Sequence, residues 1–315
     1  MPSPDRPIGV LLMTYGSPSS LDDVERYMTA VRGGRTPEPD LVTEFRRRYD
    51  VIGGSPLIEI TQRQAAAVEG ALGDGWRVRA AMRFSAPTIA DGLREMAAAR
   101  VREAVGIVMS PQYSPLLMGG YGRAVEAARA DVGDESPAVT IAGDWFREPS
   151  FVEALGSRIR QAIERLPAGE RSSVPVLLTA HSLPRRVAEQ EPGYLRQLDE
   201  TAELVAAASG IGPERWRFCW QSAGHEPGEW MKPDFADLMP VLASEGHRSV
   251  VVAPVQFLAD HLEILYDVDV GAREQAEAAG LRFERIRSLN DDPTFVAGLA
   301  AVARTTAERG ALTTA

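Results

Sequence analysis

Histidine and acidic residues follow two apolar segments, and together they could bind a divalent metal and move protons. His181 ends the apolar run Leu177–Ala180 and precedes a Ser-Leu-Pro break. A second apolar run, through Pro254 and Val255, leads into the segment Asp260-His261-Leu262-Glu263. A neutral imidazole that faces a carboxylate can accept a proton near neutral pH or hold a divalent cation. A histidine at a sheet edge is equally compatible with a structural role.

A row of acidic residues and a tyrosine also follow apolar runs of the sequence. Asp260, Glu263 and Asp267 have the i, i+3, i+7 spacing of one helix face, so a helix that begins near Asp260 would align three carboxylates. Such a row could collect a hydrated divalent cation, although a solvated acidic surface explains the same spacing. Tyr15 follows the first apolar run, at a turn that Gly16 and Pro18 favour.

The segments that must position these residues alternate between strand-like and helix-like patterns. The strand-like runs are Ile8–Thr14, Trp76–Met82, Ala104–Met109, Ala138–Ala142, Val174–Ala180, Trp216–Trp220, Ser249–Val255 and Leu281–Arg287. The clearest amphipathic stretches between them are Thr61–Leu72, Thr88–Ala99, Phe151–Arg165, Asp234–Ser244 and Thr294–Arg309. Continuous apolar strands separated by helices are typical of parallel sheets that are covered on both faces.

The eight strands divide evenly along the chain. Four precede residue 148 and four follow it, so we predict two similar α/β halves, residues 1–148 and 149–315, rather than one eight-stranded sheet. Ligands of open α/β sheets bind at the carboxyl ends of the strands. The ends of the first, fifth and seventh strands would therefore bring Tyr15, His181 and the segment from Asp260 to a cleft between the halves.

Composition excludes several classes of protein. A net charge of −10 argues against a nucleic-acid binder, which is usually basic. The single cysteine, Cys219, excludes an internal disulfide and an iron–sulfur cluster held by cysteines. No run reaches the roughly 18 apolar residues of a membrane helix, and the N-terminus lacks the apolar core of a signal peptide. Nucleotide-binding glycine motifs are also absent. We therefore expect a soluble cytoplasmic protein with no integral membrane segment.

Eight sequence blocks, taken in order, carry a family resemblance. The blocks are Leu12–Pro18, Glu25–Tyr27, Val31–Pro39, Ile52–Leu57, Pro111–Ser114, Ala180–Pro184, Trp220–Gly224 and Asp260–Asp267. Because of these blocks, the chain resembles ferrochelatases over nearly its whole length, and most closely the soluble coproporphyrin ferrochelatases of Gram-positive bacteria. The resemblance implies an α/β fold of two similar Rossmann-like domains. Each domain would have a mostly parallel four-stranded sheet flanked by helices, with a porphyrin cleft between the two domains.

The resemblance also implies roles for individual residues. His181 and Glu263, in the C-terminal half, match the catalytic pair that binds the metal and accepts protons. Tyr15 matches a tyrosine over the metal face of the porphyrin, axial to the product iron. Asp267 matches part of an acidic ridge attributed to metal delivery. Further positions match porphyrin-binding residues of the family, and these are Arg32, Arg48, Ser55 and Tyr121.

The implied activity is insertion of Fe²⁺ into coproporphyrin III to form coproheme in haem biosynthesis. Fe²⁺ is then a substrate, and no tightly bound cofactor is expected. We expect a monomer, which could contact other haem-pathway enzymes transiently. The alternatives are a protoporphyrin IX ferrochelatase and a non-catalytic tetrapyrrole- or haem-binding protein. Two positions depart from the family pattern: Gly33 stands where relatives can carry an arginine, and Gly271 where relatives can extend the acidic ridge.

Overall fold

Two four-stranded sheets, all of whose strands run parallel, form the framework of the protein. The computed structural model describes residues 6–224 and 228–313. These residues form two compact units: unit 1 comprises residues 6–145 and 290–313, and unit 2 comprises residues 146–289. Each unit contains one sheet, which confirms the prediction of two similar α/β folds with four strands each.

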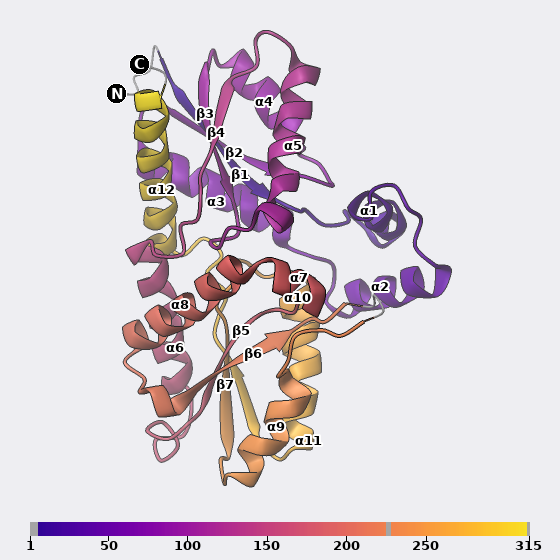
Figure 1. Ribbon diagram of the computed structural model, residues 1–315, viewed down its shortest axis with the longest axis vertical. Coiled ribbons are helices and arrows are strands. Elements are labelled where there is room, and N and C mark those ends of the chain that lie inside the picture. The colour runs from indigo at the N-terminus through magenta and orange to yellow at the C-terminus, as the bar shows by residue number, and fades with distance from the viewer. Residues whose placement is uncertain (1–5, 225–227, 314–315) are drawn as a thin grey trace. The chain divides into compact units, whose positions relative to one another are not determined.

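The sheet of unit 1 has the strand order β2-β1-β3-β4. Its strands are β1 (Ile8–Thr14), β2 (Trp76–Met82), β3 (Glu103–Val108) and β4 (Ala138–Ile141). The helices of this unit are η1 (Leu21–Asp23), α1 (Val24–Val31), α2 (Pro39–Val51), α3 (Leu57–Leu72), α4 (Ile89–Ala98), α5 (Pro115–Val132) and α12 (Pro293–Thr313). Helix α3 packs with α12, and α4 packs with α5 (Figure 1). These two pairs cover the sheet.

Burial explains why the first strand is apolar at almost every position. Six of the seven residues of β1 are buried, because β1 is a central strand with helices over both faces of the sheet. Leu11 and Met13 pack with Leu93 and Met96 of α4 in one apolar cluster. The edge strand β4 alternates between exposed and partly buried residues instead.

The last helix belongs to unit 1, although it follows the whole of unit 2 in the sequence. Phe295, Leu299 and Ala303, spaced four residues apart along α12, are fully buried, and α12 contacts α3, β3 and β4 (Figure 1). The predicted second half, 149–315, therefore differs from the structure: residues 290–313 return to unit 1. Burial of this apolar helix face against the first sheet is the physical reason.

Unit 2 repeats the arrangement with the strand order β6-β5-β7-β8. Its strands are β5 (Val176–His181), β6 (Trp216–Gln221), β7 (Ser249–Pro254) and β8 (Arg282–Arg285). Its helices are α6 (Pro149–Glu164), α7 (Arg185–Gln190), α8 (Pro192–Ser209), η2 (Pro213–Arg215), α9 (Phe235–Ser244), α10 (Leu262–Leu265), the π-helix η3 (Asp267–Ala272) and α11 (Arg273–Ala278). Helix α6 packs with α8, and α9 packs with α11 (Figure 1).

The core of unit 2 joins its central strands to helices α9 and α10. Leu177 of β5 and Val252 of β7 are fully buried and pack with Met239 of α9 and Ile264 of α10.

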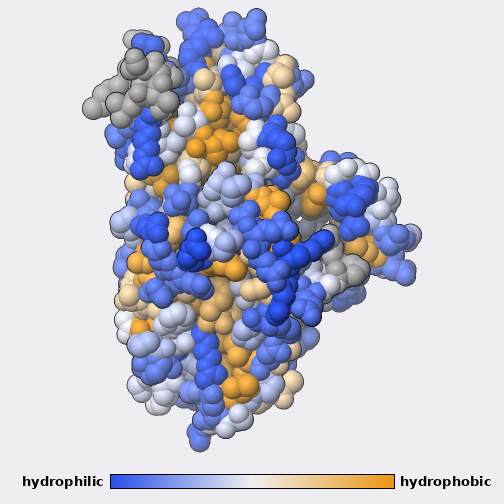
Figure 2. Space-filling model, viewed as in Figure 1, coloured by the Kyte–Doolittle hydropathy of each residue, from blue (hydrophilic) through white to orange (hydrophobic). Residues whose placement is uncertain are grey.

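Hydrophilic side chains cover most of the face drawn in Figure 2, with apolar side chains showing between them in patches. No helix among the described residues is both long and apolar enough to cross a membrane.

Candidate active site

The chain places His181 at the carboxyl end of a central strand. His181 is the last residue of β5, which lies between β6 and β7, and its Cα is in register with that of Gln221, the last residue of β6. About a third of its side chain, 33%, is exposed. Ligands of open parallel sheets bind at the carboxyl ends of the strands, so the structure puts His181 at the kind of position that was predicted for it.

The imidazole of His181 has a fixed orientation. Its Nδ1 lies 2.6 Å from the carbonyl oxygen of Ser182. A carbonyl oxygen can only accept a hydrogen bond, so Nδ1 must carry the proton that is donated. The lone pair of the neutral ring is therefore on Nε2. This is the nitrogen that can act as a base or bind a metal.

Glu263 supplies the carboxylate that was predicted to face this histidine. Its Oε1 lies 3.6 Å from His181 Nε2, and 38% of its side chain is exposed. This separation is longer than a direct hydrogen bond. It is close to the spacing of roughly 3–4 Å between two ligands that share one divalent metal at bond lengths of about 2.1 Å. The pair could therefore hold a metal between its two atoms or pass a proton from one to the other.

A buried glutamine connects the strand of His181 to the main chain of Glu263. Gln221 Oε1 accepts a hydrogen bond from Thr179 Oγ1 at 2.6 Å, and Gln221 Nε2 donates to the carbonyl oxygen of Glu263 at 3.2 Å. The strand ends of β5 and β6 are thereby tied to the start of α10. Sequence reasoning missed this role, although Gln221 stands within one of the blocks of the family resemblance and ends a strand.

The predicted helical row of Asp260, Glu263 and Asp267 is wrong. Helix α10 begins at Leu262, because the side chain of His261 caps it: His261 Nδ1 accepts a hydrogen bond from the Glu263 N–H at 3.1 Å. Asp260 precedes the helix. Asp267 begins the π-helix η3, whose wider turn changes the angular spacing of side chains. Glu263 and Asp267 are both partly buried.

Arg285 accounts for the position of Asp260. The Arg285 guanidinium is 12% exposed and forms two hydrogen bonds to Asp269, at 2.7 and 2.8 Å. It also lies 3.4 Å from Asp260, whose Oδ1 accepts a further hydrogen bond from Ser288 at 2.6 Å. One arginine thus partly neutralises two carboxylates of this region. Asp269 is engaged with Arg285, and the predicted metal-delivery role of Asp267 stays a prediction.

His261 is the other histidine of this region, and its surroundings favour the neutral form. Burial lowers its pKa, and the nearby His181 and Arg285 act in the same direction, whereas Glu263 and Asp260 oppose the shift. Because its Nδ1 accepts a hydrogen bond from the Glu263 N–H, the neutral ring carries its proton on Nε2. His181 and His261 are therefore opposite tautomers.

Tyr15 and Tyr121, both predicted to bind the porphyrin, lie together in unit 1. Tyr15 directly follows β1 and is 46% exposed. Its ring stacks on Phe84, with centroids 5.3 Å apart, and lies 5.9 Å from the ring of Tyr121. Gly16 has a φ of +89°, and a Cβ at that position would meet Ser85 Oγ at 2.0 Å. The turn after Tyr15 therefore requires glycine.

Arg83 completes this aromatic group. Its guanidinium carbon lies 5.8 Å from the ring centroid of Tyr15, 4.7 Å from that of Phe84 and 5.6 Å from that of Tyr121. These distances fit cation–π contacts. Burial raises the pKa of Tyr121, and Tyr15 adds to this effect while Arg83 opposes it, so the Tyr121 phenol stays protonated. Neither Arg83 nor Phe84 was among the predicted site residues.

The remaining predicted residues of unit 1 lie elsewhere on its helices and turns. Arg32 is exposed and caps the C-terminus of α1. Arg48, on α2, donates to Glu44 at 2.9 Å. Hydrogen bonds from Arg47 and Arg48 lower the pKa of Glu44 to about 2, so this carboxylate is charged at neutral pH. Ser55 is partly buried between α2 and α3, where its Oγ accepts from the Leu57 N–H at 3.4 Å.

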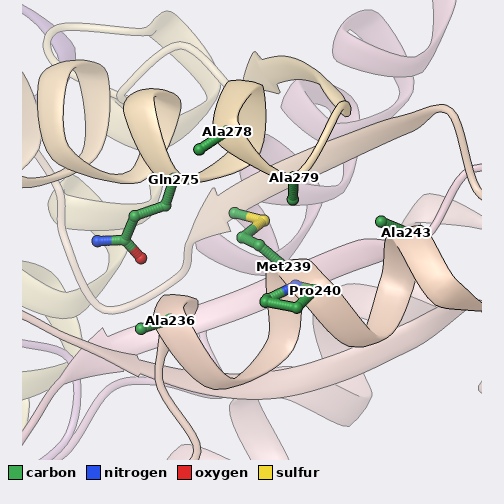
Figure 3. A pocket seen from close by; sticks show the side chains of 7 residues that line it. All are labelled: Ala236, Met239, Pro240, Ala243, Gln275, Ala278 and Ala279. Atoms are coloured by element: carbon green, nitrogen blue, oxygen red, sulfur yellow. The ribbon is translucent and has the colours of Figure 1, made fainter.

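Two other features of unit 2 are separate from these contacts. A groove of about 480 Å³ lies between α9 and α11, lined by Met239, Pro240, Gln275 and four alanines (Figure 3). Cys219 is buried, and burial raises the pKa of its thiol, with Asp234 and Asp237 acting in the same direction.

Within residues 6–224 and 228–313, no three His, Cys, Asp or Glu side chains converge on a metal position.

Solved structures of similar fold come first among the comparisons. The structure of SirB from Bacillus subtilis with Fe³⁺ superposes with a TM-score of 0.63 and covers 96% of both chains at 12% identity. The structure of DR2241 from Deinococcus radiodurans, described as similar to chelatases, has a TM-score of 0.52 at 13% identity over 94% of this chain and 55% of that one. These likenesses show a chelatase-type fold and nothing more specific.

Sequence comparison then identifies the family. The ferrochelatase family model matches residues 7–307. The ferrochelatase of Deinococcus radiodurans is 37% identical over 301 residues, which span 94% of this chain and 95% of that protein. The coproporphyrin III ferrochelatases of Geobacillus kaustophilus and Bacillus subtilis are 36% and 33% identical, over 93% and 94% of this chain and 94% and 96% of their own lengths. The chain belongs to the ferrochelatase family.

Proposed function

We propose that this protein inserts Fe²⁺ into coproporphyrin III and forms coproheme in haem biosynthesis. The observation that carries the proposal is the orientation of His181, whose Nε2 lies 3.6 Å from the Glu263 carboxylate at the end of β5 and carries the lone pair of the neutral ring. A base beside a carboxylate, with both side chains partly exposed, suits a reaction that removes protons and passes a metal.

The reaction defines what the pair must do. A free-base porphyrin loses two pyrrole N–H protons as one Fe²⁺ binds its four nitrogens, so two protons must leave for each metal inserted. His181 Nε2 accepts a proton, and Glu263 receives it from the imidazole and releases it to solvent. The same two groups are suitable ligands for Fe²⁺ before insertion, because imidazole and carboxylate bind it without the permanence of a thiolate site.

The substrate assignment has separate support. Relatives that are 33–36% identical over more than nine-tenths of this chain are coproporphyrin III ferrochelatases. Coproporphyrin III has four propionates, and protoporphyrin IX has two. By the family resemblance, Arg32 and Arg48 of unit 1 match positions that contact propionates or lie on the metal-entry side, and Tyr15 offers an exposed ring that stacks on Phe84. Arginine binds carboxylates through paired hydrogen bonds, which favours a substrate with several of them.

The test compares two porphyrin substrates under anaerobic conditions. The protein is incubated with Fe²⁺ and either coproporphyrin III or protoporphyrin IX, and loss of the free-base absorption bands is followed against a protein-free blank. We expect kcat/KM to be at least tenfold higher for coproporphyrin III. Faster metallation of protoporphyrin IX would overturn the substrate assignment in favour of the ferrochelatase alternative. Metallation of neither porphyrin above the blank would overturn the enzyme assignment and leave a tetrapyrrole-binding protein.

A further inference from the structure

The hydrogen-bond ladder beside His181 is completed by a side chain. The main chains of β5 and β7 pair as far as Thr179 and Pro254, and the next rung is the Val255 N–H, which donates to the Thr179 carbonyl at 3.1 Å. The His181 N–H points toward the same neighbour, where another parallel strand residue would offer a carbonyl. Gln256 Oε1 accepts it instead, at 2.7 Å.

The other end of the Gln256 side chain is also held. Its Nε2 donates a hydrogen bond to the hydroxyl of Tyr194, in the first turn of α8. Tyr194 is 2% exposed, so the partner of Gln256 is fixed within the core of unit 2. The amide of Gln256 therefore connects a rigid aromatic residue to the main chain of His181 and is not a surface group that happens to lie near it.

Two glutamines thus support the two members of the pair separately. Gln221 donates to the main-chain carbonyl of Glu263 at 3.2 Å, and Gln256 accepts from the main-chain N–H of His181 at 2.7 Å. The position of the His181 main chain fixes the point from which the imidazole extends. The Nδ1 contact with the Ser182 carbonyl then determines which ring nitrogen faces Glu263. Loss of the Gln256 acceptor would release the first of these constraints.

We propose that Gln256, held by Tyr194, is a positioning residue that fixes the main chain of His181 so that its Nε2 faces Glu263. This inference rests on the proposed role of His181 as base and passing metal ligand. Residues that orient metal ligands from behind commonly change metal affinity or activity by about 10- to 100-fold when they are replaced. Gln256 contacts neither the iron nor the porphyrin in this proposal.

The kinetic test replaces the amide by a side chain of similar length. Gln256→Met removes the acceptor, and we expect kcat for iron insertion to fall about 10- to 100-fold, with the dissociation constant of the free-base porphyrin unchanged within about twofold. Gln256→Glu keeps an acceptor oxygen for the His181 N–H and should recover most of the lost kcat. Gln275→Met, at the groove between α9 and α11, is the matched control and should leave kcat unchanged.

A spectroscopic test does not depend on turnover. The chain has four histidines, so the ring nitrogens of His181 can be assigned in ¹⁵N NMR spectra by comparison with His181→Ala. In the wild-type protein at pH 8 we expect the Nδ1-protonated tautomer at His181 and the Nε2-protonated tautomer at His261. Gln256→Met should shift His181 toward a mixture of tautomers and leave His261 unchanged, and Gln256→Glu should restore the wild-type spectrum.

The outcomes separate this inference from the proposed function. A Gln256→Met protein with kcat within twofold of wild type, or with an unaltered His181 tautomer, would overturn the positioning role. If the hydrogen bond from the His181 N–H to Gln256 served only to stabilise the fold, Gln256→Met would lower the thermal unfolding midpoint without changing kcat or the His181 tautomer. If Gln256→Met does not fold, Gln256→Glu and Tyr194→Phe are used to test the inference instead. Loss of the wild-type His181 tautomer in Tyr194→Phe would support the inference, and a wild-type spectrum of Tyr194→Phe would contradict it. An inactive wild-type protein would refute the proposed function, while the NMR result would still test the positioning.

Discussion

The Nδ1 atom of His181 donates a hydrogen bond to the Ser182 carbonyl at 2.6 Å, and in the neutral ring this contact puts the lone pair on Nε2, 3.6 Å from Glu263. The sequence predicted that the two side chains would meet but not which nitrogen would face the carboxylate. The neighbouring His261 has the opposite tautomer, because its Nδ1 accepts from the Glu263 N–H. Two histidines 80 residues apart thus have different chemistry: one exposes a lone pair near the carboxylate, and the other caps a helix.

Glu263→Gln should separate proton removal from porphyrin binding. The amide keeps the shape of the side chain and loses the group that accepts the proton from His181. Because a positioned acid or base contributes roughly 10²- to 10⁴-fold to rate, we expect kcat to fall at least 100-fold. The dissociation constant of coproporphyrin III, measured by fluorescence quenching, should change less than twofold. An unchanged kcat would exclude Glu263 from the reaction.

Asp267→Asn and Asp269→Asn should differ, although the two residues are only two positions apart. Asp269 is paired with Arg285, whereas Asp267, also in η3, is the residue for which the family resemblance predicts a part in metal delivery. We expect Asp267→Asn to raise the KM for Fe²⁺ about threefold to tenfold, since one carboxylate less attracts the cation, and to leave kcat unchanged. Asp269→Asn should mainly lower stability, because it leaves Arg285 without its bidentate partner. Equal effects of the two variants on the KM for Fe²⁺ would contradict this division.

Glu44→Gln should strengthen porphyrin binding. Arg48 donates to Glu44, and this carboxylate, with its pKa lowered to about 2, remains charged throughout the neutral range. Surface ion pairs are worth up to about 1 kcal/mol, so loss of the Arg48–Glu44 pair should raise the affinity for coproporphyrin III by no more than roughly fivefold. The gain should be the same at pH 6 and pH 8 and smaller in high salt. Glu153→Gln, which breaks an ion pair with Arg160 in unit 2, is the control. A weaker complex after Glu44→Gln would argue against carboxylate binding by Arg48.

His261 should make the protein less stable in mild acid. Its folded-state pKa is lowered by burial, so between that value and the unfolded value of about 6.5 the unfolded chain binds the extra proton. Stability is therefore full above the unfolded pKa and falls as the pH drops below it, by at most about 1.4 kcal/mol for each pH unit.

The check is the urea unfolding midpoint at pH 7.5, 6.5 and 5.5. His261→Asn keeps a side-chain acceptor at the start of α10 and removes the titrating ring, so its midpoint should fall less between pH 7.5 and 5.5 than that of the wild type. His247→Asn removes another histidine of unit 2 and serves as the control. An equal fall in the wild type and in His261→Asn would contradict the assignment.

The sequence determined the sheets better than the helices. The observed limits of β1 and β2, Ile8–Thr14 and Trp76–Met82, agree with the predicted ones. Strand β1 is central and apolar at nearly every position, whereas the edge strand β2 alternates buried residues with the partly buried Arg77 and Arg79. Helix α2, Pro39–Val51, was not predicted. Only Val42 and Tyr49 are buried along it, so its apolar periodicity is weak. The apolar face of α12 was visible in the sequence, but the sheet that it covers depends on tertiary packing.

The candidate site shows the same limit. The places of His181 and Glu263 after apolar runs suggested that an imidazole could face a carboxylate, and the family resemblance named these two residues as the pair. The row of Asp260, Glu263 and Asp267 failed because a side-chain cap starts α10 at Leu262 and an arginine 25 residues further on holds Asp260. Gln256 was hidden for a similar reason: its role follows from where β7 leaves the sheet, at Pro254, and strand ends are set by pairing rather than by local sequence.

The most direct test of the central claim is a single-turnover measurement on His181→Ala. The wild-type and variant proteins are loaded with coproporphyrin III, mixed with Fe²⁺ under anaerobic conditions, and followed by loss of the free-base absorption bands. We predict that both bind the porphyrin with similar dissociation constants and that the variant metallates it at least 100-fold more slowly, close to the rate of the protein-free blank. Insertion of iron by His181→Ala at a rate near that of the wild type would contradict the account.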